Sequence, residues 1–410
     1  MTRPHVLSFR LMTNSTAEYF ASPWSRRIPR RMRKRGIRGC RSLGVRIIEH
    51  SPRGNTPMKQ VRQGSLKFDG FRPFASFAFE QKLSLSAPET PAKFASQLAA
   101  EIRKATDDDK FVFGHRTESM FAAMVTSLGS VKLIKGEDGT DCFAEDETLE
   151  VPDFRVVLQD GRQLLIEAKN FHQGDAPTKP FRMKANYVDS LTAYAKLMKC
   201  DLCIAVYWSR WNLWSLTTPA AFSRSGDWCT TDLGTAMKFN AMSLVGDVMV
   251  GTKMPLKMVF EVEHLSEARP EPTTREFEAR ITNVYASCAG RRIEDATESR
   301  IAFYMMLYGN LVEETIPVFH DDRLVAFEHV FNKEQETDQG FELVGSLSSM
   351  FSRFYRHATS DQDKGGVKQI HARTRPGALG QLIPKGFKGD ALPLWILHQR
   401  PGEPGESIKE

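Results

Sequence analysis

The sequence predicts an α/β fold: a mixed central sheet flanked by helices, followed by a smaller α+β domain. Three observations support this prediction. Residues 91–216 alternate helical and strand-like segments, the order expected of a layered α/β domain. Residues 202–208, LCIAVYW, form an apolar run typical of a strand buried on both faces. A charged segment with two prolines, residues 267–276, indicates a boundary between this domain and the elements that follow.

Composition excludes several classes of protein. The chain has 410 residues, of which 41% are hydrophobic and 26% charged, so collagen, coiled coil and global disorder are unsuitable descriptions. No segment approaches the ~18 consecutive apolar residues of a membrane helix, and the start lacks the apolar block of a secretory signal. Six cysteines are too few for a disulfide scaffold. We therefore expect a soluble, cytoplasmic protein without a membrane partner.

The positive charge is concentrated at the start of the chain. Residues 1–50 contain twelve Arg or Lys and two acids, although the whole chain carries a net charge of only +6. This segment has three interpretations. It is consistent with an arm that binds nucleic-acid phosphates or with an organelle transit peptide. It is also consistent with a disordered tail, or with a sequence that has been started too early and whose true first residue is Met58. We expect residues 1–57 to be disordered.

The elements of the first domain are predicted in order along the chain. Residues 71–86 alternate like a strand or hairpin, and Pro91 opens a helix. A second helix is predicted within 116–129, with Thr117 as its N-cap and Gly129 as its end. The remaining predictions are strands in SVKLIK, VPDFRVVL and QLLIEAKNF, a helix over 186–199, the strand 202–208 and a strand in WNLWSLTT.

The domains are bounded by these patterns. The first domain is expected over 58–266, with its core over 91–216. A C-terminal α+β domain is expected over 277–400, with helices at 294–309 and 341–358 and strand-like pieces between them. Its last helix suits a winged-helix reader of DNA or a helix that is simply packed. Residues 401–410 are expected to be a disordered tail.

A hairpin is predicted where Asp160-Gly161 separates two apolar runs. The loop length decides which side chains meet across it. A two-residue loop leaves Asp153 and Glu167 on opposite faces. A three-residue loop with Gly161 in the left-handed conformation places them opposite each other.

On the three-residue register Asp153, Glu167 and Lys169 share one face. Two carboxylates and an ammonium are costly to bring together without a compensating ion. Mg²⁺, or Mn²⁺ in its place, binds through one or two carboxylates and accepts a carbonyl ligand, for which Ala168 is the candidate. Near a phosphate such an ion activates water, which Lys169 would orient. The opposite face is suited to packing on helices through Phe154, Val156, Leu164, Ile166 and Ala168.

The pattern Pro152-Asp153, thirteen intervening residues and then Glu167-Ala168-Lys169 resembles the PD-(D/E)xK nuclease superfamily. Its members include restriction endonucleases, Holliday-junction resolvases and transposon-end nucleases. In that superfamily a preceding helix carries a further Glu, which Glu118 matches in type and place. The resemblance covers roughly residues 91–216. It implies a restriction endonuclease-like mixed sheet, one or two Mg²⁺ ions and hydrolysis of DNA phosphodiesters.

The helix after the hairpin bears on the subfamily. RecB-like nucleases carry Gln and Tyr four apart on the next helix, whereas here Ser190 precedes Tyr194 by four residues. The PDF hairpin and a separate C-terminal module are similar to transposon-end nucleases and to nucleases of bacterial anti-phage systems.

Weaker signals have two interpretations each. Lys179, Arg182 and Lys184 are candidates to bind nucleic-acid phosphates, although their segment is equally consistent with a solvated loop. His172 suits proton transfer or a polar surface.

The cysteines and tryptophans are similarly ambiguous. Cys200 and Cys203 suggest an iron–sulfur cluster only weakly, and buried thiols are favoured. Three tryptophans can stack on bases or close the core, and the core is favoured: Trp208, Trp211 and Trp214.

The sequence therefore predicts a Mg²⁺-dependent DNA endonuclease with Asp153 and Glu167 as ligands, Glu118 as an auxiliary ligand and Lys169 orienting the attacking water. Double-stranded cutting needs two active sites, so we expect a homodimer or a component of a larger complex. Two alternatives stay open: a non-catalytic nucleic-acid-binding adaptor on the same fold, and an RNA nuclease.

Overall fold

The computed structural model divides into two compact units. The first unit is built from described residues within 57–246, 355–378 and 400–410, and the second from those within 1–56, 247–354 and 379–399. Within the described part of the chain, no helix is both long and apolar enough to span a membrane. The structure describes residues 6–12, 266–271 and 274–278 by backbone only, and otherwise 70–138, 142–145, 148–174, 176, 178–265, 279–361 and 366–402.

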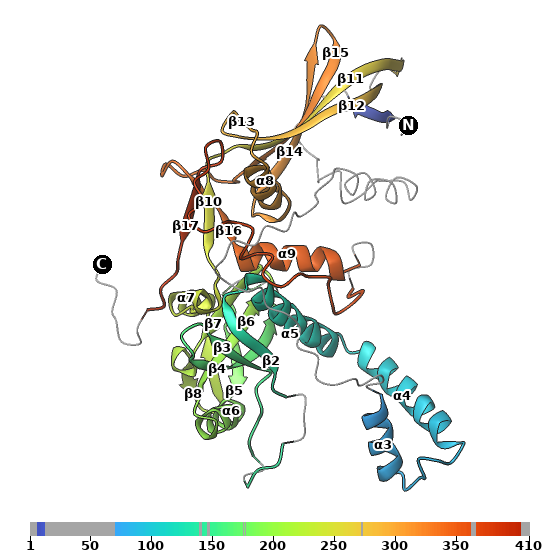
Figure 1. Ribbon diagram of the computed structural model, residues 1–410, viewed down its shortest axis with the longest axis vertical. Helices are drawn as coiled ribbons and strands as arrows, with labels where there is room; N and C mark the ends of the chain where they lie inside the picture. The colour runs from blue at the N-terminus through green and yellow to red at the C-terminus, as the bar shows by residue number, and fades with distance from the viewer. Residues whose placement is uncertain are drawn as a thin grey trace. The chain divides into compact units, whose positions relative to one another are not determined.

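A five-stranded mixed sheet forms the centre of the first unit (Figure 1). Its order is β2-β3-β4-β6-β7, in which β4 and β6 are parallel and the other neighbours antiparallel. The predicted α/β class with a mixed sheet is confirmed. The strands are β2 (Val131–Gly136), β3 (Phe154–Leu158), β4 (Gln163–Phe171), β6 (Asp201–Trp208) and β7 (Leu213–Thr217). The α-helices are α3 (Phe71–Glu80), α4 (Thr90–Thr106), α5 (Asp109–Leu128), α6 (Ala185–Leu197) and α7 (Leu233–Lys238).

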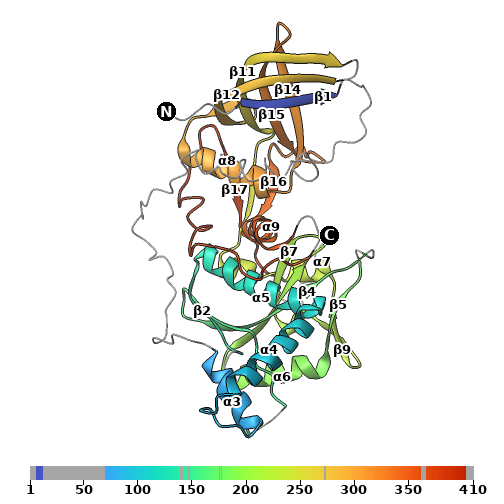
Figure 2. The ribbon, with the colours of Figure 1, turned by 90° about the vertical axis from the view of Figure 1, so that its right-hand side faces the viewer.

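Helices cover both faces of this sheet. On one face, the ring of Phe121 in α5 lies 5.7 Å from that of Phe154 in β3. On the other face, Leu191 of α6 packs in a cluster with Leu165 of β4. Leu165 and Phe154 point to opposite faces because Phe154 pairs with Ile166 and side chains alternate along a strand. Figure 2 shows α5 lying across the sheet.

The strand predicted over 71–86 is wrong, because residues 71–80 form helix α3. Phe74 and Phe77 both pack on Phe94 of α4, with ring centroids 5.5 and 5.4 Å apart. Their spacing of three places them on one side of a helix. Phe77 and Phe79 alternate with other residues as in a strand, but packing of Phe74 and Phe77 on α4 favours the helix.

Helix α5 begins at Asp109, about two turns before the predicted N-cap Thr117. Asp108 is the N-cap, and its side chain accepts hydrogen bonds from two backbone N–H groups of the first turn at 2.9 and 3.3 Å. Gly129 ends the helix, as predicted, in the left-handed conformation with φ +66°. Glu118 therefore lies in the third turn and not the first.

A small antiparallel sheet lies beside α6, in the order β5-β9-β8. Its first strand leads directly into α6, so the side chains of that strand lie next to the start of the helix. The strands are β5 (Phe181–Lys184), β8 (Ser223–Ser225) and β9 (Trp228–Thr231).

The second unit is built around a long antiparallel sheet in the order β1-β12-β11-β15-β14, with β13 pairing with β12. A three-stranded sheet in the order β16-β10-β17 accompanies it. The strands are β1 (Val6–Met12), β10 (Met249–Thr252), β11 (Leu256–Glu271), β12 (Thr274–Cys288), β13 (Arg291–Ile293), β14 (Val312–His320), β15 (Arg323–Asn332), β16 (Glu342–Ser346) and β17 (Leu394–Leu397). The helices are α8 (Ala296–Tyr308) and the part of α9 (Leu347–Thr359) up to residue 354.

Three predictions for this part of the chain are wrong. Residues 267–276 are not a linker; they include the end of the β11/β12 hairpin, and the units divide at 247. A hairpin end rich in charge and proline has the composition of a linker, which explains the error. The helix predicted from 341 is preceded by strand β16 and begins at Leu347. Residues 6–12, expected to be disordered, form β1, whereas 13–57 and 403–410 lie outside the described residues.

Candidate active site

The β3/β4 hairpin has the predicted three-residue loop. Leu158 N–H donates to Arg162 O at 2.9 Å, and Gly161, with φ +93°, donates to Leu158 O at 3.0 Å. Phe154 pairs with Ile166, so the preceding residue, Asp153, comes opposite Glu167. The predicted register is confirmed.

Asp153 is held at the end of the hairpin by the strand beside it. Its Oδ2 accepts a hydrogen bond from the Ala168 N–H at 2.7 Å. Ala168 follows Glu167 in β4, so the segment that carries the Glu167 carboxylate also orients the Asp153 carboxylate. A charged acceptor makes this a strong type of hydrogen bond.

Glu167 is almost completely buried, with 1% of its side chain exposed. Its Oε1 accepts hydrogen bonds from the Tyr187 hydroxyl at 2.6 Å and from the Lys169 ammonium. Its Oε2 is buried and, among the described residues, has no hydrogen-bond partner. A buried carboxylate oxygen without a partner is costly, and a cation would satisfy it.

Burial and the charges of the site together shift the pKa values of Asp153 and Lys169. Burial and the nearby charge of Glu167 raise the pKa of Asp153 to about 7, against the opposing effects of Lys169 and the Ala168 N–H. Burial alone would lower the pKa of Lys169, but the charges of Glu167 and Asp153 outweigh it and raise that pKa. With Asp153, Glu167 and Lys169 all ionised, two negative charges face one positive charge, so the three side chains carry a net negative charge.

Glu118 lies beside this group but not within it. Its Oε2 is 3.0 Å from His115 Nδ1, on the same helix. It contributes a smaller charge effect at Asp153 and Lys169. A cavity of about 380 Å³ between α5 and the end of β4 is lined by Asp109, Lys110, Phe113, Gly114, Glu118, Ala168, Lys169 and Asn170.

The donor set fits a divalent ion bound by few protein ligands. No three His, Cys, Asp or Glu side chains of the described residues are arranged to hold a metal ion. The structure therefore does not bring Glu118 into a three-carboxylate cluster, and its role as auxiliary ligand stays a prediction. Asp153 and Glu167 do meet, and Mg²⁺ typically uses one or two carboxylates and several waters. The unpartnered Glu167 oxygen fits such an ion.

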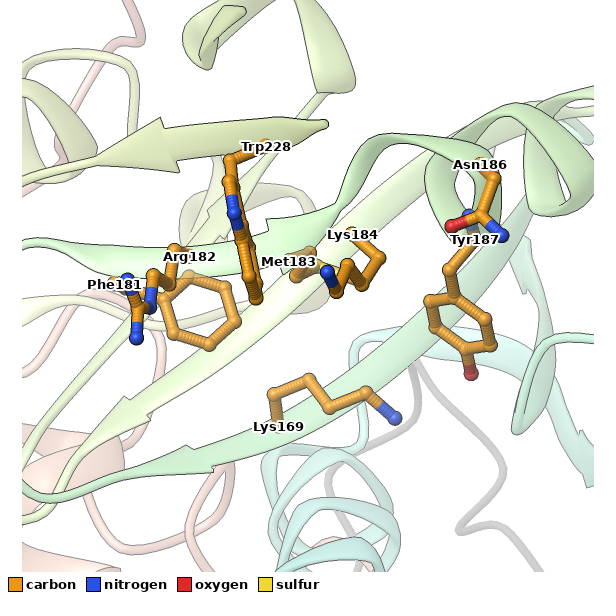
Figure 3. A pocket seen from close by; sticks show the side chains of 8 residues that line it. All are labelled: Lys169, Phe181, Arg182, Met183, Lys184, Asn186, Tyr187 and Trp228. Carbon is orange, nitrogen blue, oxygen red and sulfur yellow. The ribbon is translucent and has the colours of Figure 1, made fainter. Parts of the chain in front are cut away.

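A second cavity, of about 450 Å³, lies on the other side of Lys169 (Figure 3). Of the three residues predicted to bind phosphates, Arg182 and Lys184 line this cavity and Lys179 does not, and phosphate binding stays a prediction. The lining residues are Lys169, Phe181, Arg182, Met183, Lys184, Asn186, Tyr187 and Trp228.

Two residues of this region were missed by the sequence reasoning. The helical pattern places Tyr187 on a packing face, and its contact with Glu167 follows from the way β5 leads into α6. Trp228 lies far along the chain, and only the pairing of β9 with β5 places it here. No local sequence signal could have identified Trp228.

The structure places the residues of the weaker signals in different environments. The described cysteines are free thiols, and Cys203 is buried within β6. Trp208 and Trp214 are buried core residues, and Trp211 is exposed. His172 Nδ1 lies 3.0 Å from the Ser209 hydroxyl, and it does not line either cavity.

Comparisons with known proteins give little guidance. No family model matches the chain, and no curated protein matches it. Among solved structures the chain is similar to Hjc, a Holliday junction resolvase from the archaeal hyperthermophile Archaeoglobus fulgidus, at 16% sequence identity and a TM-score of 0.20. The similarity covers 25% of this chain and 76% of that one. A TM-score this low supports no conclusion about fold or function.

Proposed function

We propose that the first unit is a metal-dependent nuclease that hydrolyses DNA phosphodiesters. Asp153, Glu167 and the carbonyl of Ala168 would hold Mg²⁺, and Lys169 would act on the attacking water. The observation that carries the proposal is the meeting of two carboxylates and one ammonium at the end of a single hairpin, with one buried Glu167 oxygen left without a partner among the described residues.

The electrostatics of the group support a cation ligand. Burial and the charge of Glu167 disfavour the ionised form of Asp153, and the nearby ammonium of Lys169 offsets this only in part. A divalent cation would stabilise both ionised forms together. When bound, Mg²⁺ would lower the pKa of a water molecule and neutralise the charge that builds on the phosphate oxygens.

The chain's own residues organise this chemistry. The Ala168 N–H orients Asp153, and the Tyr187 hydroxyl orients Glu167, so neither carboxylate must be ordered during the reaction. Lys169 is one-third exposed and lines both cavities, where its ammonium can meet a water and a phosphate oxygen. A positive charge placed there stabilises the negative charge of the transition state.

Cleavage of supercoiled plasmid DNA in Mg²⁺ tests the proposal. Lys169→Ala should lose cleavage by a factor of at least about 100, since general acid–base groups typically contribute that much. Lys132→Ala, an exposed lysine of β2, is the matched control and should cut like the parent. Equal cutting by Lys169→Ala and the parent would exclude this mechanism.

The same assay separates the alternatives. We propose DNA as the substrate, and duplex DNA and RNA of matched sequence should be offered side by side. Preferential RNA cleavage would contradict the DNA assignment while leaving the site intact. DNA binding that is insensitive to Mg²⁺, without any cleavage, would favour the adaptor. Sedimentation analysis of the full chain tests the expected homodimer.

A further inference from the structure

Strand β5 presents two cations on the same side. Phe181 and Met183 are buried in the hydrophobic cluster that includes Leu165 and Leu191, whereas Arg182 and Lys184 are exposed. Side chains alternate along a strand, so the buried pair fixes which way the cations point. Their common orientation therefore follows from packing and not from a chance rotamer.

Trp228 lies between these two cations. Its strand β9 is antiparallel to β5, and Trp228 pairs with Lys184. The Arg182 guanidinium carbon is 4.6 Å from the centroid of the Trp228 ring, and the Lys184 ammonium is 4.1 Å from it. Figure 3 shows the indole extending from β9 between the two side chains. Both contacts are within the range of cation–π attraction.

Neither cation has a carboxylate partner among the described residues, although a neighbour on the same small sheet does. Arg224 of β8 forms two hydrogen bonds of 2.8 Å with Asp189. Arg182 and Lys184 instead lie against the ring, which attracts cations but leaves their full charge available to an anion. Lys169 lines the same cavity, so three positive side chains face one space.

We propose that Arg182, Trp228 and Lys184 form a shelf that binds two consecutive phosphates of the substrate strand, next to the phosphate that reacts at Lys169. This inference rests on the proposed nuclease function and adds the residues that hold the flanking strand. Residues two apart in a strand are about 6.6–6.8 Å apart, a spacing comparable with that of consecutive phosphates in one strand. Trp228 is a positioning residue, since it acts through the two cations.

The ligand is a phosphate backbone and not a stacked base. The indole offers a base-stacking surface only when its faces are free, and here cations lie over the ring. A sugar–phosphate backbone places anions in a row, which suits two outward-facing cations beside Lys169. The shelf should therefore contribute affinity without sequence preference.

Binding of duplex DNA in EDTA tests the shelf without cleavage. The slope of log affinity against log salt concentration falls by about 0.9 for each phosphate that the protein no longer neutralises. Arg182→Gln combined with Lys184→Gln should lower the slope by about 2, and Trp228→Leu by about 1. Trp228→Phe, which retains a ring, should keep the parent slope. Lys196→Gln removes one charge from the far end of α6, roughly 15 Å from Asn186, and should change nothing.

The outcomes separate this inference from the proposed function. An unchanged slope in the double variant would overturn the shelf, even if the parent cuts DNA. A reduced slope in the double variant but not in Trp228→Leu would overturn the role of Trp228. A parent that shows the predicted slopes but never cuts would support the shelf and remove the nuclease proposal. Partial misfolding lowers the active fraction but leaves the slope unaltered, so the slope distinguishes binding from stability.

Discussion

Removing the Tyr187 hydroxyl should weaken Mg²⁺ binding without removing a metal ligand. This hydroxyl donates to Glu167 Oε1 at 2.6 Å, within a carboxylate that is almost fully buried. A hydrogen bond to a charged group contributes about 1.5–3 kcal/mol. That range corresponds to roughly a 10- to 100-fold change in an equilibrium constant. Loss of a residue that orients a metal ligand typically weakens metal binding by about 10- to 100-fold, so we expect Tyr187→Phe to raise the Mg²⁺ concentration for half-maximal cleavage by up to that factor.

A second tyrosine on the same helix provides the control. Tyr194 donates to Glu137 Oε1 at 3.1 Å, and the Glu137 carboxylate also pairs with Arg155. Tyr194→Phe removes the same hydroxyl from a carboxylate that is not a proposed metal ligand. It should leave the Mg²⁺ dependence unchanged. An identical Mg²⁺ dependence for Tyr187→Phe and the parent, with both proteins folded, would refute the role of Tyr187 in orienting Glu167.

Two further predictions follow from the same geometry. Because the pKa of Asp153 is raised to about 7, protons should compete with Mg²⁺ for this carboxylate below that pH. The Mg²⁺ concentration needed for half-maximal cleavage should therefore be higher at pH 6 than at pH 8. Equal concentrations at the two pH values would contradict this prediction. Gly161 has φ +93° and open space around its missing Cβ, so Gly161→Ala should cost only backbone strain, roughly 1–2 kcal/mol. Urea unfolding measures this cost. An unchanged unfolding midpoint would contradict the expected backbone strain of alanine at position 161.

Much of the site could be predicted because it lies within one hairpin. The parity of β-strands and the left-handed preference of Gly161 determine the register, so the meeting of Asp153 with Glu167 follows from local sequence. Local hydrophobic patterns also predicted helices α4 and α6 and strands β4 and β6, which the structure contains. These patterns arise from neighbours in sequence, which is why they can be identified without coordinates.

The errors concern contacts between distant segments. Helix α3 resembles a strand until Phe94 of α4 provides a surface on which Phe74 and Phe77 pack. The β11/β12 hairpin resembles a linker because its end is polar and charged, and pairing alone identifies it. Trp228 reaches the active-site region only through the pairing of β9 with β5. Such contacts depend on tertiary structure that no local pattern encodes.

Titration of the full chain with Mn²⁺, followed by calorimetry, measures whether the hairpin end binds a divalent metal ion. We expect at least one Mn²⁺ equivalent to bind the parent and none to bind Glu167→Gln at this site, because the substitution removes the charge from the buried carboxylate. Glu101→Gln, an exposed acid of α4, should bind Mn²⁺ like the parent. Equal Mn²⁺ binding by Glu167→Gln and the parent would contradict a metal site at the hairpin end.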